Sequence, residues 1–178
     1  MRKPLALALA TLTAASVAAL VPTAANAADT NVTFTLTGGS LTLSAPGSAS
    51  LSAAGNLGVT GTSVSGQLGN STVDDARGSL AHTVTVNMST TNFTDGSGDT
   101  IAKSNATGSS GATTPTGVAV AVPTLTGQTI GAAGGATILT LTGVIGSAST
   151  TYNPTVSVTI PANSIAGSYS GTVTQTAS

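Results

Sequence analysis

The sequence contains no cysteine, no tryptophan and no glutamate, and it has a single histidine. Without cysteine the chain cannot form a disulfide, so packing and hydrogen bonds must hold its fold. Aromatic residues are also rare: Phe34, Phe93, Tyr152 and Tyr169. Thr, Ser, Gly, Ala and Val dominate instead. Because disorder goes with low hydrophobicity and high net charge, and this chain has neither, the composition favours a folded domain.

Charged side chains are equally scarce. Beyond residue 27, two basic residues stand against five acidic ones, which gives a net charge of −3: Arg77 and Lys103, and Asp29, Asp74, Asp75, Asp95 and Asp99. So few Lys and Arg residues leave no positive surface for nucleic acid or anionic lipid. Neither class of partner is therefore expected.

The first 27 residues have the organisation of a secretory signal peptide. Arg2 and Lys3 form a positive start, residues 5–20 are apolar, and Ala25-Asn26-Ala27 is a cleavage site of small residues. A membrane anchor is less favoured, because the apolar run is short and no positive stop follows it. Cleavage after Ala27 leaves residues 28–178, enough for one domain without a membrane span. We expect a secreted bacterial protein, extracellular or associated with the cell wall.

Short stretches that alternate apolar and hydroxyl residues predict β-strands along most of this domain. Gly, Pro and Asn turns separate them, including residues 78–81 and 131–135. The expected strands are residues 30–37, a strand begun by Leu41 and Leu43, and residues 62–68, 72–77, 82–88, 118–122 and 137–142. No window beyond the signal has helical periodicity.

The end of the chain predicts a closing β-hairpin. Residues 155–160 alternate, Pro161 cannot donate to a ladder and ends the strand, and residues 162–167 form a turn. Residues 169–177 then alternate again. The whole pattern predicts an all-β fold, a single β-sandwich of the immunoglobulin-like or Greek-key type with about nine short strands.

His82 is the one imidazole available for catalysis. A Ser-His-Asp triad would have to use it, with Asp74 or Asp75 nearby in sequence. No G-x-S-x-G elbow is present, and His82 shares the parity of Val84 and Val86. A half-buried strand residue is therefore the favoured interpretation, and no catalytic residue is expected.

Two acidic clusters invite functional interpretations. Asp74 and Asp75 are neighbours on a strand and point to opposite faces, so they cannot share one substrate bond. Asp75 and Arg77 share a face, which favours a structural ion pair. Residues 95–99 lack the ligand order of a calcium loop, so a turn closed by Asp side-chain bonds is favoured over a metal site. Neither a metal nor a cofactor is expected.

Two segments together resemble the WxL domain of Gram-positive cell-surface proteins. Residues 72–78 (TVDDARG) followed by residues 82–84 look like that family's V-x-D-x-R-G stretch and its first Trp-x-Leu. Residues 158–162 and 166–177 look like its closing hairpin, with I-P-A, A-G-x-Y and the second Trp-x-Leu. The start at residues 32–34 also fits the actinobacterial WxL-like branch.

The Trp-x-Leu signatures themselves are replaced. His82 and Val84 stand at the first, and Gln175 and Ala177 at the second. Position 175 shares the parity of Val173 and Tyr169, so Gln175 is expected inward or at a rim, where an unpartnered amide would cost roughly 1–3 kcal/mol.

The resemblance implies a β-sandwich that associates non-covalently with peptidoglycan. Its family-equivalent binding positions are His82, Val84, Gln175 and Ala177, while Asp75, Arg77 and Tyr169 are expected to be structural. We therefore expect a non-enzymatic cell-envelope protein with peptidoglycan or other surface proteins as partners. The alternative is a structural or adhesin-type subunit that pairs through its strand edges.

Overall fold

β-Strands make up nearly all of the regular structure in a computed structural model that describes residues 31–53 and 62–178. The signal peptide expected over residues 1–27 lies outside these described residues. The chain divides into two units, Met1–Thr35 and Leu36–Ser178. In the second unit the described helical structure is one 3-10 turn, Lys103–Asn105. The predicted all-β, sandwich-like fold is confirmed.

Twelve strands occur in the part of the chain that the structure describes, rather than about nine. They are β1 (Leu41–Ser44), β2 (Ser52–Ala53), β3 (Ser63–Gln67), β4 (Ser71–Thr90), β5 (Phe93–Thr94), β6 (Thr100–Ile101), β7 (Ala106–Ser109), β8 (Thr113–Pro123), β9 (Gln128–Thr129), β10 (Ala136–Tyr152), β11 (Thr155–Thr159) and β12 (Val173–Ala177). Two of them are long, since β4 has 20 residues and β10 has 17.

The strands pair antiparallel in three sheets. The first has the order β1-β4-β10-β8, with β12 also paired to β4, and the second has the order β2-β3-β11-β7-β9. The third contains β5 and β6 alone. The order β3-β11-β7 repeats the order β4-β10-β8, because a short connection joins β3 to β4, β10 to β11 and β7 to β8.

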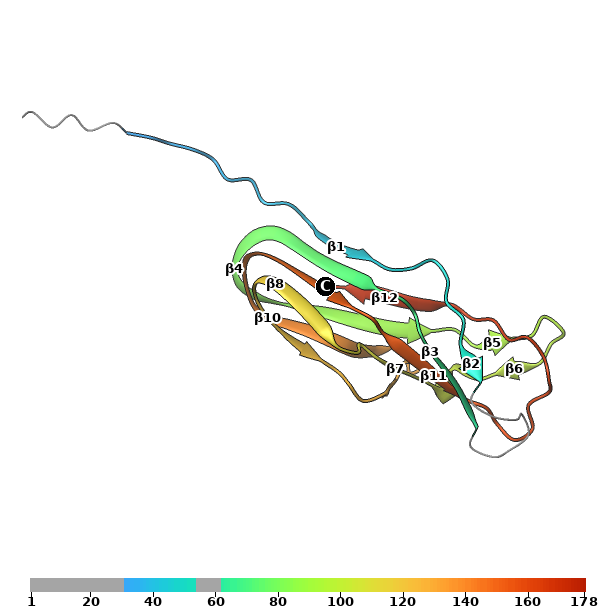
Figure 1. Ribbon diagram of the computed structural model, residues 1–178. Coiled ribbons are helices and arrows are strands. Elements are labelled where there is room, and N and C mark those ends of the chain that lie inside the picture. The colour runs from blue at the N-terminus through green and yellow to red at the C-terminus, as the bar shows by residue number, and fades with distance from the viewer. Residues whose placement is uncertain (1–30, 54–61) are drawn as a thin grey trace, which may run out of the picture. The chain divides into compact units, whose positions relative to one another are not determined.

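The long strands β4 and β10 fold over within their own length (Figure 1). Gly78, in the middle of β4, has a φ of +68°, and the pairing of β10 with β4 shifts register around Gly143 and Gly146. In β8, Gly117 has a φ of +82° opposite Ala148. Glycine enters this left-handed region at little steric cost, so neighbouring strands can bend side by side. Residues 72–77 and 82–88 are thus two arms of one strand, not two strands joined by the predicted turn.

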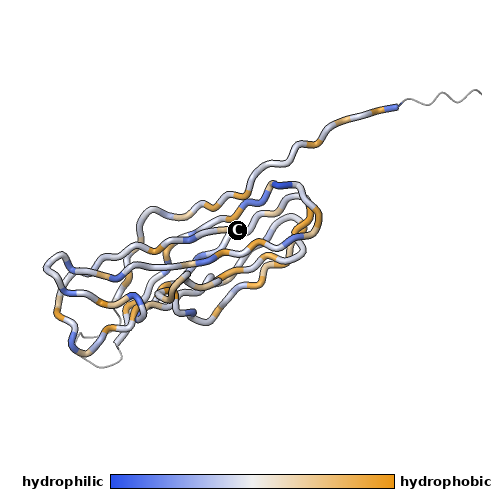
Figure 2. The backbone as a smooth tube through the Cα atoms, turned by 180° about the vertical axis from the view of Figure 1, so that it is seen from behind, coloured by the Kyte–Doolittle hydropathy of each residue, from blue (hydrophilic) through white to orange (hydrophobic). Residues whose placement is uncertain are grey.

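The two arms of β4 bury alternate side chains in one apolar core. Val73 on the first arm and Val84, Val86 and Met88 on the second are all fully buried. Strands β10 and β11 complete the core, chiefly through Ile138, Leu139, Leu141, Val144, Tyr152, Val156 and Val158. Figure 2 shows mostly white and orange positions along the chain, with only scattered blue ones. Burial of this apolar surface is the main favourable term in the fold, at about 25 cal/mol per Å².

The strand expected over residues 30–37 is wrong for the described residues Asn31–Thr37. No strand is assigned there, and Val32, Phe34 and Leu36 are 77%, 85% and 87% exposed. Alternation gives this segment the propensity for a strand, but a strand also needs a neighbour for its backbone groups.

The predicted closing hairpin is also wrong. Both of its strands exist, but β11 pairs with β3 and β7, whereas β12 pairs with β4 in the other sheet. Tyr169 lies before β12, next to an isolated bridge between Thr94 and Ser170. Local alternation marks a strand without specifying its partner, and here burial of Val156 and Val158 against β3 and β7 decides the pairing.

Other sequence predictions are confirmed. A strand begins at Leu41 and ends before Pro46, and another lies within residues 62–68. Residues 118–122 and 137–142 lie inside β8 and β10, and residues 131–135 form a turn.

Candidate functional site

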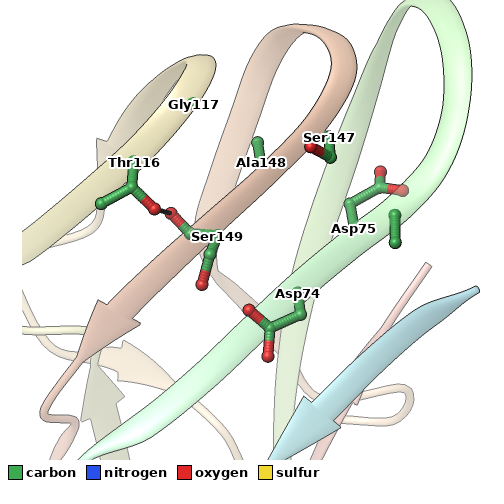
Figure 3. Close-up of a pocket in the computed structure, with 8 residues that line it drawn as sticks. Asp74, Asp75, Thr116, Gly117, Ser147, Ala148 and Ser149 are labelled. Atoms are coloured by element: carbon green, nitrogen blue, oxygen red, sulfur yellow. Dashed lines mark hydrogen bonds between the residues drawn. The ribbon is translucent and has the colours of Figure 1, made fainter.

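The charged residues of β4 gather at its bend. Asp75 continues the inward parity of Ser71 and Val73, and its side chain is completely buried. Its neighbour Asp74 is exposed and points to another side (Figure 3). This confirms the expectation that the two carboxylates point to opposite faces of the strand.

Arg77 binds the buried carboxylate in a bidentate manner. Its Nε donates to Oδ1 of Asp75 at 3.0 Å, and its Nη2 donates to Oδ2 at 2.8 Å. The Arg77 backbone N–H donates to Oδ1 as well, at 3.1 Å. This confirms the ion pair predicted from their shared face.

His82 returns to the same carboxylate from the second arm of β4. Its Nε2 lies 2.6 Å from Oδ2 of Asp75, and its Nδ1 lies 2.9 Å from the Leu80 carbonyl oxygen and 3.2 Å from Oγ of Ser79. A carbonyl and a carboxylate can only accept, so the doubly protonated imidazole is the form that satisfies both contacts. The predicted half-buried position of His82 is also confirmed.

The pKa values of the cluster follow from these contacts. Hydrogen bonds from Arg77 hold the pKa of Asp75 well below its usual range, against the opposing effect of burial, and the bond from His82 adds to the lowering. The bond to Asp75 raises the pKa of His82, and the contact with the Leu80 carbonyl raises it further. Asp75 also raises the pKa of Arg77. The cluster is therefore an ionised network.

A serine, the histidine and an aspartate do meet here, although the sequence did not single out Ser79. In a hydrolytic triad the imidazole must offer a lone pair to the serine hydroxyl. The Nδ1 of His82 lies closer to the Leu80 carbonyl oxygen, at 2.9 Å, than to the Ser79 hydroxyl, at 3.2 Å, and a carbonyl partner requires Nδ1 to be the donor. The contacts are those of an ion network across the bend.

A small hollow lies beside the bend, where β8, β10 and β4 arch over next to one another (Figure 3). It encloses about 270 Å³ and is lined by Asp74, Asp75 and Ala76, by Thr116 and Gly117, and by residues 147–149. The Thr116 hydroxyl donates to the Ser149 carbonyl oxygen at 3.2 Å. Apart from Asp74 and Asp75, its polar side chains are hydroxyls, and Ser149 lies opposite Asp74 in the pairing of β10 with β4.

A larger groove of about 740 Å³ opens between other parts of the same unit. Residues 43–51 and 164–175 form its sides, and Val64, Val156 and Val158 lie among its apolar lining residues. Its lining is mainly aliphatic, with Phe93 and Tyr169 as its aromatic members. The Tyr169 hydroxyl donates to the Ile165 carbonyl oxygen at 2.9 Å, in keeping with the structural role expected for that residue.

The four positions equivalent to the WxL signatures lie on two paired strands. His82 and Val84 are on β4, and Gln175 and Ala177 are on β12, where they face Met88 and Val86 across the pairing. Val84 is fully buried, and the other three are half-buried. All four lie on the inward parity of their strands, and Gln175 also lines the larger groove.

Gln175 has the partners that its buried amide requires. Its Oε1 accepts from the Tyr152 hydroxyl at 2.7 Å, and its Nε2 donates to Oγ of Ser71 at 3.2 Å. Burial raises the pKa of the Tyr152 phenol to about 12, so the phenol stays a donor at neutral pH. The expectation for Gln175 is confirmed, and the amide joins β12 to the core.

The acidic loop at residues 95–99 is closed by its own first side chain. Oδ1 of Asp95 accepts from the backbone N–H groups of Ser97, Gly98 and Asp99 at 2.8, 3.1 and 3.0 Å. This confirms the predicted Asp-closed turn. In residues 31–53 and 62–178, no group of three or more His, Cys, Asp or Glu side chains is placed to hold a metal ion.

An exposed apolar stripe was missed by the sequence analysis. Val118, Val120 and Val122 on β8 are 57%, 63% and 52% exposed, and Ile145, opposite Val118, is 49% exposed. The strand itself was predicted, but not its position at a sheet edge. The one sequence feature that corresponds to this stripe is the alternation of Val and Ala over residues 118–122. In the structure the larger side chain, Val, faces outward at every second residue.

Comparison with protein families, curated proteins and solved structures finds no match to this chain. The resemblance to WxL domains therefore stays a prediction. The described part of the chain holds no helix that is both long and apolar enough to cross a membrane.

Proposed function

We propose that this chain is an exported, non-enzymatic protein of the bacterial cell envelope that pairs with other protein chains through the edge of its sandwich. The observation that carries this proposal is the exposed apolar edge at Val118–Val122. The predicted signal peptide supports export, and the absence of cysteine suits a bacterial secreted protein.

The non-enzymatic part of the proposal is supported by how the charged groups are used. Arg77 and His82 both bind Asp75, and both ring nitrogens of His82 face acceptors, the Asp75 carboxylate and the Leu80 carbonyl. The charged groups of the cluster bind one another and so hold two arms of one strand together. No nucleophile–base pair remains in it.

The edge-pairing part is supported by what β8 lacks. Natural edge strands are protected by charged side chains, prolines or short length, because unpaired backbone groups attract other strands. Residues 118–122 carry none of these protections, since Pro115 and Pro123 lie outside them. In the described structure β10 is the only strand paired with β8.

A photoreactive amino acid placed at Val120 tests the proposal in cells of a producing bacterium. We expect covalent adducts between this chain and a protein, because position 120 would lie inside the contact. The matched control carries the same amino acid at Leu80, which is 88% exposed on the bend of β4. Equal adduct yields at both positions, or no protein adduct at position 120, would contradict edge pairing.

Association with peptidoglycan is the second candidate, and it rests on the resemblance to WxL domains. The segment 72–84, which carries the first part of that resemblance, folds around the contacts that Asp75 makes with Arg77 and His82. Sedimentation of the purified exported protein with isolated peptidoglycan tests this candidate. A protein that stays in the supernatant at every salt concentration and pH does not bind the wall in this way.

A further inference from the structure

The segment Val32–Leu36 has the pattern of a strand, but residues 31–53 and 62–178 provide no strand that pairs with it. Val32, Phe34 and Leu36 alternate with Thr33 and Thr35, and their exposures range from 77% to 87%. Residues 31–37 contain no Gly, Pro or charged residue. Exposure of three large apolar side chains in a row is costly in water, so another surface can stabilise this segment by covering it.

Strand β8 has the complementary property: a formed strand with one unoccupied edge. It pairs with β10 along residues 113–123, and the described residues supply no strand on its other side. Between its two prolines, Val118–Val122 matches Val32–Leu36 in length and in alternation. Each has a larger apolar side chain at its first, third and fifth positions.

We propose that Val32–Leu36 of one molecule adds as a strand to β8 of a second copy, alongside Val118–Val122. This inference rests on the proposed edge pairing and names its occupant. Backbone hydrogen bonds along the edge would give affinity, as in other cases of strand addition. Val32, Phe34 and Leu36 would pack beside Val118, Val120 and Val122, while Thr33 and Thr35 would face the opposite side of the sheet.

The donor must come from another molecule, because the beginning of the same chain is tied to the far edge of the sheet. Gly39 donates to the Ala76 carbonyl oxygen at 2.7 Å, next to β1. Strands β4 and β10 lie between β1 and β8, so the two edges are about 14 Å apart at 4.8 Å per strand. The three residues from Leu36 to Gly39 span at most about 11 Å. Leu36 therefore cannot lie alongside β8 of its own chain.

A contact of this kind has different surfaces on its two sides. Each molecule offers one donor segment and one acceptor edge, so association is head-to-tail. It produces either a closed ring or an open chain of molecules. A five-residue strand makes a small interface, so each contact is expected to be weak and to depend on concentration.

Single-cysteine variants test the contact on the exported protein, after mass spectrometry has established its N-terminus. The absence of native cysteine makes the background zero. Phe34→Cys protein mixed with mass-tagged Val120→Cys protein is expected to give a mixed disulfide dimer on mild oxidation, because neighbouring strand side chains come within disulfide range. Phe34→Cys mixed with Leu80→Cys is the matched control. Equal dimer yields in the two mixtures would overturn the proposal.

Lysine variants test the same contact without a covalent bond. In analytical ultracentrifugation over a concentration series, the unmodified protein is expected to form a ladder of oligomers. Phe34→Lys and Val120→Lys are each expected to weaken association at least tenfold. Their mixture is expected to form a one-to-one dimer and nothing larger, because one variant keeps the acceptor and the other keeps the donor. Circular dichroism checks that both variants fold.

Each alternative has its own signature in these experiments. Pairing of two β8 edges would leave Phe34→Lys able to associate, and pairing of two N-terminal segments would leave Val120→Lys able to associate. Either result overturns the proposal, as does an unmodified protein that stays monomeric at every concentration. Photo-adducts from position 120 to a different protein, with no disulfide between positions 34 and 120, would leave edge pairing standing and remove this occupant.

Discussion

The Nε2 atom of His82 lies 2.6 Å from Oδ2 of Asp75, and this contact joins the two arms of β4 across the bend at Gly78. Arg77 binds the same carboxylate from the first arm. A buried negative charge therefore has two cationic partners within one strand. The positive φ of Gly78 permits the bend, and the hydrogen bonds that Asp75 accepts from Arg77 and His82 stabilise it.

Asp75→Asn is expected to lower the free energy of unfolding by about 2–3 kcal/mol. The amide keeps the size of the carboxylate but loses its charge, and it leaves Arg77 and His82 without an anionic partner. Urea unfolding followed by circular dichroism measures the change. Asp74→Asn is the matched control, because Asp74 is exposed, and it should change stability by less than about 0.5 kcal/mol. Similar losses for both variants would contradict the role of Asp75.

The contact also predicts a dependence of stability on pH. Asp75 raises the pKa of His82 above 6.5 in the folded state, so the stability that protonated His82 supplies is fully present below pH 6.5. It is lost as the pH rises through the folded-state pKa. Thermal unfolding between pH 5 and pH 9 should show this loss, and His82→Gln should remove it.

NMR titration of the single imidazole tests the cause directly. We expect a pKa above 6.5 in the native protein and a lower value in Asp75→Asn, because the hydrogen bond to Asp75 is the main cause of the raised pKa. An unchanged imidazole pKa in that variant would show that the carboxylate does not control it.

Tyr152→Phe is expected to lower the free energy of unfolding by about 1–2 kcal/mol, because it leaves the half-buried Oε1 of Gln175 without its donor. In an ultraviolet titration, the variant should also lack the phenol whose pKa is about 12. Tyr169→Phe is the matched control, since it removes a phenol that donates to a carbonyl in an exposed setting. A phenol titrating at about 12 in Tyr152→Phe would contradict the assignment.

Gly117→Ala tests the bend of β8. A Cβ atom at Gly117 would lie 2.5 Å from the Ser147 carbonyl oxygen, whereas a Cβ atom at Gly143 would meet open space. Both glycines have positive φ, so both variants carry the cost of that backbone conformation, about 1–2 kcal/mol. Only Gly117→Ala adds a backbone clash, and it should lose about 1–3 kcal/mol more in urea unfolding. Equal losses would mean that β8 and β10 separate at little cost.

The sequence predicted part of the candidate site. The spacing of Asp75 and Arg77 placed them on one face, and the ion pair followed. The approach of His82 to Asp75 could not be predicted, because the residues between them were read as a turn between two strands rather than as a bend inside one. The edge position of β8 could not be predicted either, because it depends on which strands are absent beside β8.

Alternation of Val, Leu and Ile with Thr and Ser was enough to determine that this chain folds as β-strands, and parity placed the buried side chains of β4 and β11 on one face. In β8 parity did not determine burial, because the larger side chains Val118, Val120 and Val122 face outward. Partner choice was decided only in three dimensions: β11 and β12, adjacent in sequence, pair in different sheets, and residues 31–37 pair with no strand in the described part of the chain. The physical reason is that side-chain periodicity is a property of one strand, whereas hydrogen-bond pairing and burial are shared between strands that the fold brings together.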